Sequence, residues 1–256
     1  MKHYDRLAEE RGGFGGWRPR LLELSPRWQW YSRLIFFKEI PKDPFPQIHF
    51  IDDHDGRARR LVDSCLRPFS DVGMDELLKF LLNRFGYSEC RDLPPLIKKH
   101  HVEHWEATFD VATAISLDRD VFGDAYSDCM GKGLRSGTGY FPTPISVCRL
   151  IADMTLTQAD LFSTVHDPCV GSGRMLLPAS NRSLFLSGMD VNPVCIRMTL
   201  VNGFLFAPQI VIPPPAELRP QKSRKVVIPR NTLMRLSAEL EEVGHGSTTR
   251  RFQSAH

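Results

Sequence analysis

The sequence predicts an α/β fold after about residue 131, preceded by a mainly α-helical region. Two apolar stretches, residues 161–166 and 184–189, have the length of buried strands, and a helix-like stretch separates them. A Gly-x-Gly bend follows the first stretch, and the acid Asp190 ends the second. A strand, a tight glycine loop, a helix, a second strand and an acid, in this order, are typical of a nucleoside-cofactor site in an open α/β sheet.

The glycine loop, residues 167–173, reads Asp-Pro-Cys-Val-Gly-Ser-Gly. Glycine tolerates backbone angles that other residues resist, so the main chain can approach a ligand closely. The loop lacks the third glycine of the dinucleotide fingerprint and the Gly-Lys-Ser/Thr of a P-loop. Asp190 can accept hydrogen bonds from both hydroxyls of a ribose. A ligand with ribose and adenine but no phosphate, such as S-adenosylmethionine, fits best; an ordinary turn is the alternative.

A second motif lies upstream, where residues 139–144 read Gly-Tyr-Phe-Pro-Thr-Pro. The apolar residues that follow, through Met154, recur at helical spacing. We expect Thr143 to be the N-cap of this helix and Pro144 its first residue, because proline suits the first helical position. A capped helix that binds nothing is the alternative interpretation.

Together these motifs resemble the S-adenosylmethionine-dependent adenine-N6 DNA methyltransferases, specifically the modification subunits of type I restriction systems and their phage and plasmid relatives. The family motif Gly-x-Phe/Tyr-x-Thr-Pro corresponds to residues 139–144, and Asp-Pro-x-x-Gly-Ser/Thr-Gly corresponds to residues 167–173. Asp190 corresponds to the acid after the next strand, and residues 120–126 resemble a short Gly-Asp-x-Tyr lead-in. The resemblance covers approximately residues 110–207.

This resemblance implies a partial Rossmann-like methyltransferase fold that binds S-adenosylmethionine. In the family, the upstream motif and the glycine loop contact the methionine part of the cofactor, and the acid contacts the ribose. The cofactor-binding residues that it implies here are Tyr140, Phe141, Thr143, Pro144, Asp167, Pro168, Gly171, Ser172, Gly173 and Asp190.

The family's catalytic motif, Asn/Asp/Ser-Pro-Pro-aromatic, is not found in this sequence. In the family its polar side chain and a proline carbonyl bind the adenine amino group, and its ring stacks on a base flipped out of the duplex. Residues 93–96 and 212–216 contain adjacent prolines without the polar residue or the ring. The catalytic residues are therefore unknown. We expect either a truncated or degenerate methyltransferase or a partner chain that completes the site; a non-catalytic binding or assembly module is the alternative.

We divide the chain into three parts. Residues 1–56 are expected to be an irregular leader and a small N-terminal segment, and residues 57–130 a helical region. Within that region the pattern predicts helices at 74–85 and from residue 96 to 117, after two prolines. Residues 131–256 would be the cofactor-binding domain with a basic tail.

Other local patterns are weaker. We predict a short strand at residues 47–51. We predict a further strand at residues 225–231, and the roughly 65 residues after Asp190 leave room for about two strands. Phe14 and Trp17, in a glycine-rich stretch, could stack on single-stranded nucleic acid, although a flexible leader is the simpler interpretation.

Two patterns superficially resemble metal sites. His100 and His104 lie at i, i+4, and acidic residues gather at 52–55. The histidines lack the glutamate of the metalloprotease arrangement, and Asp/Gly clusters are common in turns. We therefore expect no metal site; a metal-dependent protein that uses His100, His104 and the acidic turn at 52–55 is the alternative.

Composition indicates a globular protein, with 42% hydrophobic and 25% charged residues. No apolar run approaches the roughly 20 residues that span a bilayer, and no apolar signal core follows the N-terminus. Six scattered cysteines fit reduced thiols, so we expect a cytoplasmic protein without a membrane partner. We expect two partners, DNA and a second protein chain. The basic residues between 219 and 251, or a partner subunit, would contact the DNA. The alternative is that these basic residues are only a solvated surface.

Overall fold

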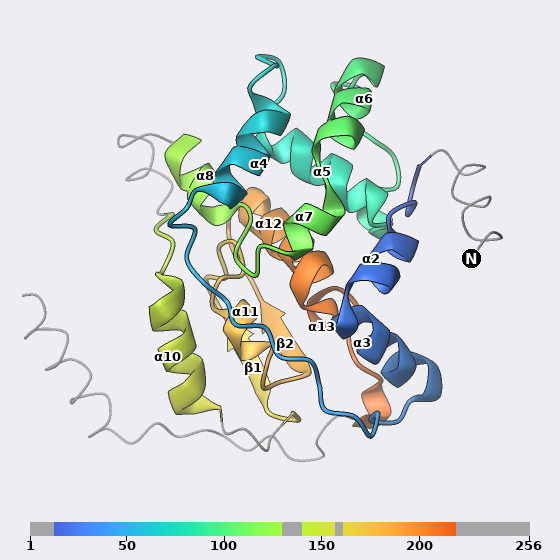
Figure 1. Ribbon diagram of the computed structural model, residues 1–256, viewed down its shortest axis with the longest axis vertical. Helices are drawn as coiled ribbons and strands as arrows, with labels where there is room; N and C mark the ends of the chain where they lie inside the picture. Colours follow the sequence, from blue (N-terminus) through green and yellow to red (C-terminus); the bar gives the residue numbers. More distant parts are fainter. Residues whose placement is uncertain (1–12, 130–139, 157–160, 219–256) are drawn as a thin grey trace, which may run out of the picture. The chain divides into compact units, whose positions relative to one another are not determined.

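The computed structural model describes residues 13–129, 140–156 and 161–218, all of which belong to one compact unit of the chain. This part is rich in helices and contains one small parallel sheet (Figure 1). Such a unit is consistent with the partial α/β methyltransferase-like fold that the sequence predicts. Among the described helices, none combines the length and the apolar character needed to cross a membrane.

The sheet consists of β1 (Thr164–Asp167) and β2 (Phe185–Gly188), which pair in parallel. Parallel strands need a crossover connection, and here it contains the glycine loop and the short helix α11 (Leu176–Ala179). Asp167 lies opposite Gly188, so both strands end at the same edge of the sheet. Both predicted strands are confirmed.

The helix α12 (Pro193–Phe206) packs against α5 (Met74–Arg84) and lies between the sheet and the N-terminal helices (Figure 1). The bounds of α5 agree with the helix predicted at residues 74–85. Phe85 stacks on Phe204, with ring centroids 5.1 Å apart. One hydrophobic cluster contains residues from both sides of residue 130, so the core crosses the boundary that we placed there, and the division into domains stays a prediction.

The expected irregular leader is wrong for its described part. Residues Arg18–Leu24 form α2 and residues Pro26–Phe37 form α3. Ser25 separates the two helices, and its side chain accepts a hydrogen bond from the backbone N–H of Trp28, as an N-cap does. The prolines near the start of each helix are therefore compatible with helix initiation.

Trp17 does not present a free stacking surface. Its ring stacks on Phe109 at 5.9 Å and packs edge-on against Phe80 and Phe85, at 5.8 and 5.6 Å. Phe14 lies beside the guanidinium group of Arg91. A nucleic-acid role for Trp17 is therefore wrong.

The single helix expected between residues 96 and 117 is two helices. α6 (Lys99–Thr108) ends where Phe109 adopts an extended conformation, and α7 (Val111–Ile115) begins after Asp110. The carboxylate of Asp110 accepts hydrogen bonds from the backbone N–H groups of Ala112 and Thr113. This N-cap starts a new helix and explains the break.

The predicted strand at residues 47–51 is also wrong, because this segment pairs with no strand in the part of the chain that the structure describes. The side chain of Asn181 takes the place of a neighbouring strand. Its Oδ1 accepts from Ile48 N at 3.0 Å, and its Nδ2 donates to Ile48 O at 2.9 Å. The predicted strand at 225–231 and the basic tail lie outside the described residues.

The other described elements are α4 (Arg57–Leu66), η1 (Ser88–Cys90), α8 (Gly123–Cys129), α10 (Ile145–Thr155), α13 (Pro208–Val211) and η2 (Ala216–Leu218).

Candidate cofactor site

The glycine loop and the acid lie in direct contact. Gly171 and Gly173 have φ angles of +54° and +86°, in the left-handed region that favours glycine. The backbone N–H of Gly171 donates to Oδ2 of Asp190 at 2.9 Å. The predicted loop and the predicted acid, which are separated in sequence by β2, are thus brought together at the edge of the sheet.

Asp190 is also fixed to the start of α12. Its Oδ1 accepts from the backbone N–H of Asn192 at 2.9 Å, and Asn192 in turn caps the helix by accepting from Val194 N at 2.9 Å. Carboxylate oxygens can each accept more than one hydrogen bond. The half-buried carboxylate of Asp190 therefore retains the capacity to accept from a ligand.

A cavity of about 400 Å³ lies beside Asp190. This volume is in the range of small-molecule sites, which is about 300–1,000 Å³. Its lining comes from Asp190 and the start of α12 and from the N-terminal helical region, and it combines charged with apolar side chains. Of the ten predicted cofactor-binding residues, Asp190 alone is among those that line this cavity.

Tyr140 packs beside the glycine loop. A Cβ atom added to Gly171 would lie 3.4 Å from Cε2 of Tyr140, and the rings of Tyr140 and Tyr126 are 5.1 Å apart. Burial raises the pKa of Tyr140, so its hydroxyl stays protonated. Among the described residues this buried hydroxyl makes no hydrogen bond of ordinary geometry.

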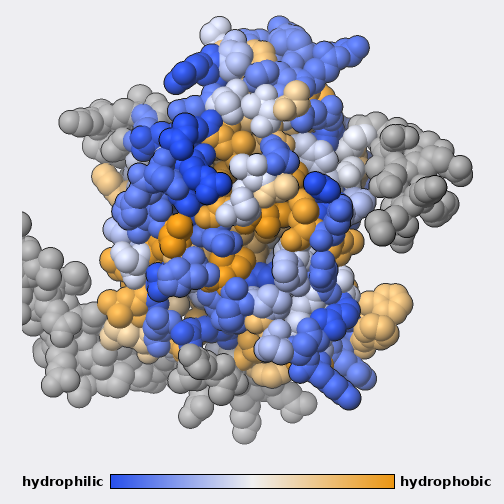
Figure 2. Space-filling model, in the orientation of Figure 1, coloured by the Kyte–Doolittle hydropathy of each residue, from blue (hydrophilic) through white to orange (hydrophobic). Residues whose placement is uncertain are grey.

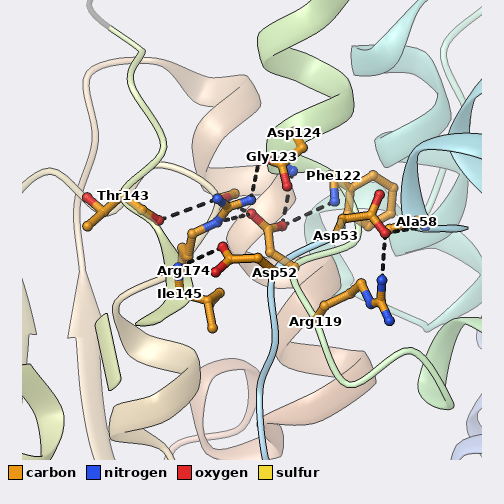
Figure 3. Close-up of polar contacts among 12 residues, drawn as sticks. Asp52, Asp53, Ala58, Arg119, Phe122, Gly123, Asp124, Thr143, Ile145 and Arg174 are labelled. Carbon is orange, nitrogen blue, oxygen red and sulfur yellow. Dashed lines mark hydrogen bonds and ion pairs between the residues drawn. The ribbon is translucent and has the colours of Figure 1, made fainter. Parts of the chain in front are cut away.

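The remaining residues of the upstream motif lie at the start of α10. Phe141 is exposed, at 71%. Thr143 does not cap the helix as expected: Pro144 is the N-cap and Ile145 the first helical residue. Oδ1 of Asp52, from a distant segment, accepts the hydrogen bond of Ile145 N at 2.9 Å (Figure 3), and this carboxylate makes a Thr143 cap unnecessary.

Under the loop lies a buried polar network that sequence reasoning missed, centred on Asp120. Oδ2 of Asp120 accepts from Ser172 Oγ at 2.6 Å and from Arg174 Nε at 3.0 Å, and its Oδ1 accepts from Asn202 Nδ2 at 2.8 Å. The backbone N–H groups of Phe122 and of Gly123, the first residue of α8, also donate to Oδ1, at 3.1 and 3.0 Å. Ser172 is therefore oriented by the protein itself.

Arg174 links this network to the upstream motif (Figure 3). It pairs with Asp124 at 2.9 Å and donates to the carbonyl of Thr143 at 3.4 Å. Burial lowers the pKa of Arg174, but the charges of Asp120 and Asp124 outweigh burial and raise the pKa above its ordinary value. The arginine is thus a permanent cation that joins three segments. The Asp-x-x-Gly-Asp sequence of the lead-in is the only signal that pointed here.

The two metal-like patterns have other roles. Asp53 pairs with Arg119 at 2.8 Å (Figure 3). Asp55 pairs with the same arginine at 2.6 Å. His104 Nε2 lies 3.0 Å from the carbonyl of Ser64, whereas His100 is exposed. Within the described part of the chain, no three His, Cys, Asp or Glu side chains are grouped as a metal site would require.

The loop, the acid and the parallel strands are consistent with a partial α/β methyltransferase-like fold. A family model described as N-6 DNA methylase matches residues 117–207. This segment is therefore similar to the adenine-N6 DNA methyltransferases, and it contains every predicted cofactor residue together with Asp120. Comparisons with curated proteins and with solved structures gave no match.

Proposed function

We propose that the chain binds S-adenosylmethionine and acts as an adenine-N6 DNA methyltransferase of the type I modification-subunit kind, within a restriction-modification system. The observation that carries the proposal is the bond between Gly171 and Asp190 at the edge of the 400 Å³ cavity. It supports a site where one carboxylate holds a ribose beside a glycine loop. The match to the N-6 DNA methylase family supports the reaction class.

The residues present fit this cofactor chemically. Asp190 would accept hydrogen bonds from the ribose hydroxyls, while the glycine loop and Tyr140 would hold the methionine part. When bound, S-adenosylmethionine supplies an electrophilic methyl group. The chain's contribution is to position that group, because an in-line displacement depends mainly on orientation and stabilised charge.

We further propose that a partner chain completes the catalytic site and that DNA is the substrate. The missing Asn-Pro-Pro-aromatic motif supports a partner. The helix α10 also supports a partner, because three apolar residues on its outer face are exposed: Val147 (39%), Leu150 (52%) and Met154 (49%). Figure 2 shows hydrophobic surface on this side of the molecule. An apolar helical stripe of this kind commonly marks a protein contact. We also propose a cytoplasmic location.

Calorimetry with S-adenosylmethionine tests the cofactor. We expect the wild-type chain to bind it, and we expect Asp190→Ala to weaken binding roughly a hundredfold, since two hydrogen bonds to a charged acceptor are lost. Asp153→Ala, which removes an exposed carboxylate on α10, should leave the affinity unchanged. No binding by the wild-type chain, alone or with a co-encoded partner, would contradict the proposal.

The missing motif also favours a second candidate, a non-catalytic methyltransferase-like module kept for binding or assembly. This candidate predicts cofactor binding without methyl transfer. Incubation of the isolated chain with DNA and S-adenosylmethionine, followed by mass spectrometry of the nucleosides, separates the two. N6-methyladenine produced by the isolated chain would exclude the second candidate.

A further inference from the structure

The cavity beside Asp190 has a wall that the family match does not include. Five of its lining residues lie before residue 117, where the family match begins: Tyr87, Glu89, Cys90, Asp92 and Pro94. They belong to η1 and its flanks, the segment that follows α5. The cofactor region thus supplies one side of the cavity and the N-terminal helical region the other.

We infer that this segment, which we call the η1 wall (residues 87–94), holds the purine base of the cofactor and selects adenine through the carboxylates of Glu89 and Asp92. The inference rests on the proposed function. Asp190 and the η1 wall line the same cavity. A nucleoside whose ribose contacts Asp190 would therefore have its base within reach of the wall.

The η1 wall is held in place before any ligand binds. The buried side chain of Asn83 donates from Nδ2 to the carbonyls of Cys90 and Arg91, at 3.0 and 2.8 Å. The backbone N–H of Tyr87 donates to Leu82 O at 2.8 Å, which closes the end of α5. A prearranged wall lowers the entropic cost of binding.

The charges of the cavity favour a ligand that donates hydrogen bonds. Its two cations, Lys79 and Arg197, both pair with Asp75, at 2.6 and 2.5 Å. The carboxylates of Glu89, Asp92 and Asp190 have no such cation paired to them among the described residues. Carboxylates only accept hydrogen bonds, so this lining disfavours a phosphate and favours hydroxyl and amino groups.

Apolar and aromatic groups lie beside these carboxylates. Leu82, Ile196 and Leu200 offer apolar contacts to a flat ring, with Tyr87 next to them. Burial raises the pKa of Tyr87, and the negative charge of Glu89 raises it further, as expected for two neighbouring groups. A purine with a 6-amino group can donate to these acceptors, whereas a 6-oxo purine would place its oxygen against them.

Two ligands that differ only in the group at position 6 of the purine test the inference. Calorimetry would compare S-adenosylhomocysteine with S-inosylhomocysteine, which has a 6-oxo group. We expect the wild-type chain to bind the adenosyl compound about 10- to 100-fold more tightly, the range for one hydrogen bond to a charged group. The double variant Glu89→Ala/Asp92→Ala should reduce this ratio to near one. The control Glu23→Ala/Glu103→Ala, on α2 and α6, should keep it.

Each outcome is decisive. Equal affinities in the wild-type chain, or a ratio that the double variant preserves, would overturn the inference and leave the proposed function standing. Absence of binding of either compound to the wild-type chain would overturn both. A second variant, Cys90→Trp, fills the cavity from the η1 wall. It should abolish binding of both compounds, and unchanged affinity would also overturn the inference.

Discussion

Replacing Asp120 with alanine is expected to lower the free energy of unfolding by about 3–5 kcal/mol, the usual cost of removing one partner from a buried ion pair. The Asp120 side chain is only 1% exposed, and its partner Arg174 is 7% exposed. The substitution would leave five donors without their acceptor, among them Ser172 Oγ and Asn202 Nδ2. Each buried polar group without a partner adds a desolvation cost.

Urea unfolding followed by tryptophan fluorescence measures this effect, because three of the four tryptophans are buried. Asp43→Ala is the matched control: it also removes an aspartate paired with an arginine, Arg33, but both side chains are about half exposed. Exposed pairs contribute little to stability, so the control should stay near wild type. Similar midpoints for the two variants would contradict the role of Asp120.

The variant Asp120→Asn separates the effect of the negative charge on stability from the effect of side-chain volume. The amide has nearly the same size, but its NH₂ group would face Ser172 and Arg174, which are themselves donors. We therefore expect Asp120→Asn to be destabilised as well, by about 2 kcal/mol or more, since a buried donor facing donors is unsatisfied. A wild-type midpoint would show that shape rather than charge matters at this position.

Local patterns were sufficient to predict the strands and the loop. Apolar runs of strand length, a Gly-x-Gly bend and a terminal acid lie within 30 residues of each other, so their order alone indicates β1, the loop and β2. The contact between Gly171 and Asp190 follows from that order, because parallel strands end at the same edge. The helix α5 could also be predicted from the sequence, because its apolar residues recur at helical spacing.

Features that depend on residues far apart in the sequence could not be predicted from local patterns. The partners of Asp120 lie 52, 54 and 82 residues away, at Ser172, Arg174 and Asn202. No local pattern indicates such a network. The same reason applies to Asp52, which caps α10 from 93 residues away, and to the η1 wall. The α2 and α3 helices were missed because prolines near a helix start resemble the breakers of an irregular segment.

Gly123→Ala is the second change with a large expected effect. Gly123 is the first residue of α8, where helix propensity alone would favour alanine by up to about 1 kcal/mol. A Cβ atom there, however, would overlap Oδ2 of Asp120 and lie 2.7 Å from both Ser172 Oγ and Tyr140 Oη. The surrounding side chains are buried, so they cannot move away cheaply, and overpacking of this kind costs about 1–3 kcal/mol or more. The clash therefore outweighs the propensity.

Gly73→Ala is the control, because Gly73 precedes the first residue of α5 and the nearest atom to an added Cβ is Glu76 Oε2 at 3.8 Å. Loss of a glycine N-cap should cost less than about 1 kcal/mol. We expect Gly123→Ala to lose about 3 kcal/mol in urea unfolding and to bind S-adenosylmethionine more weakly, since the clash displaces Tyr140 and Ser172 together. If Gly123→Ala were as stable as Gly73→Ala, the lead-in would not be packed against the glycine loop, and the position of Ser172 would need another explanation.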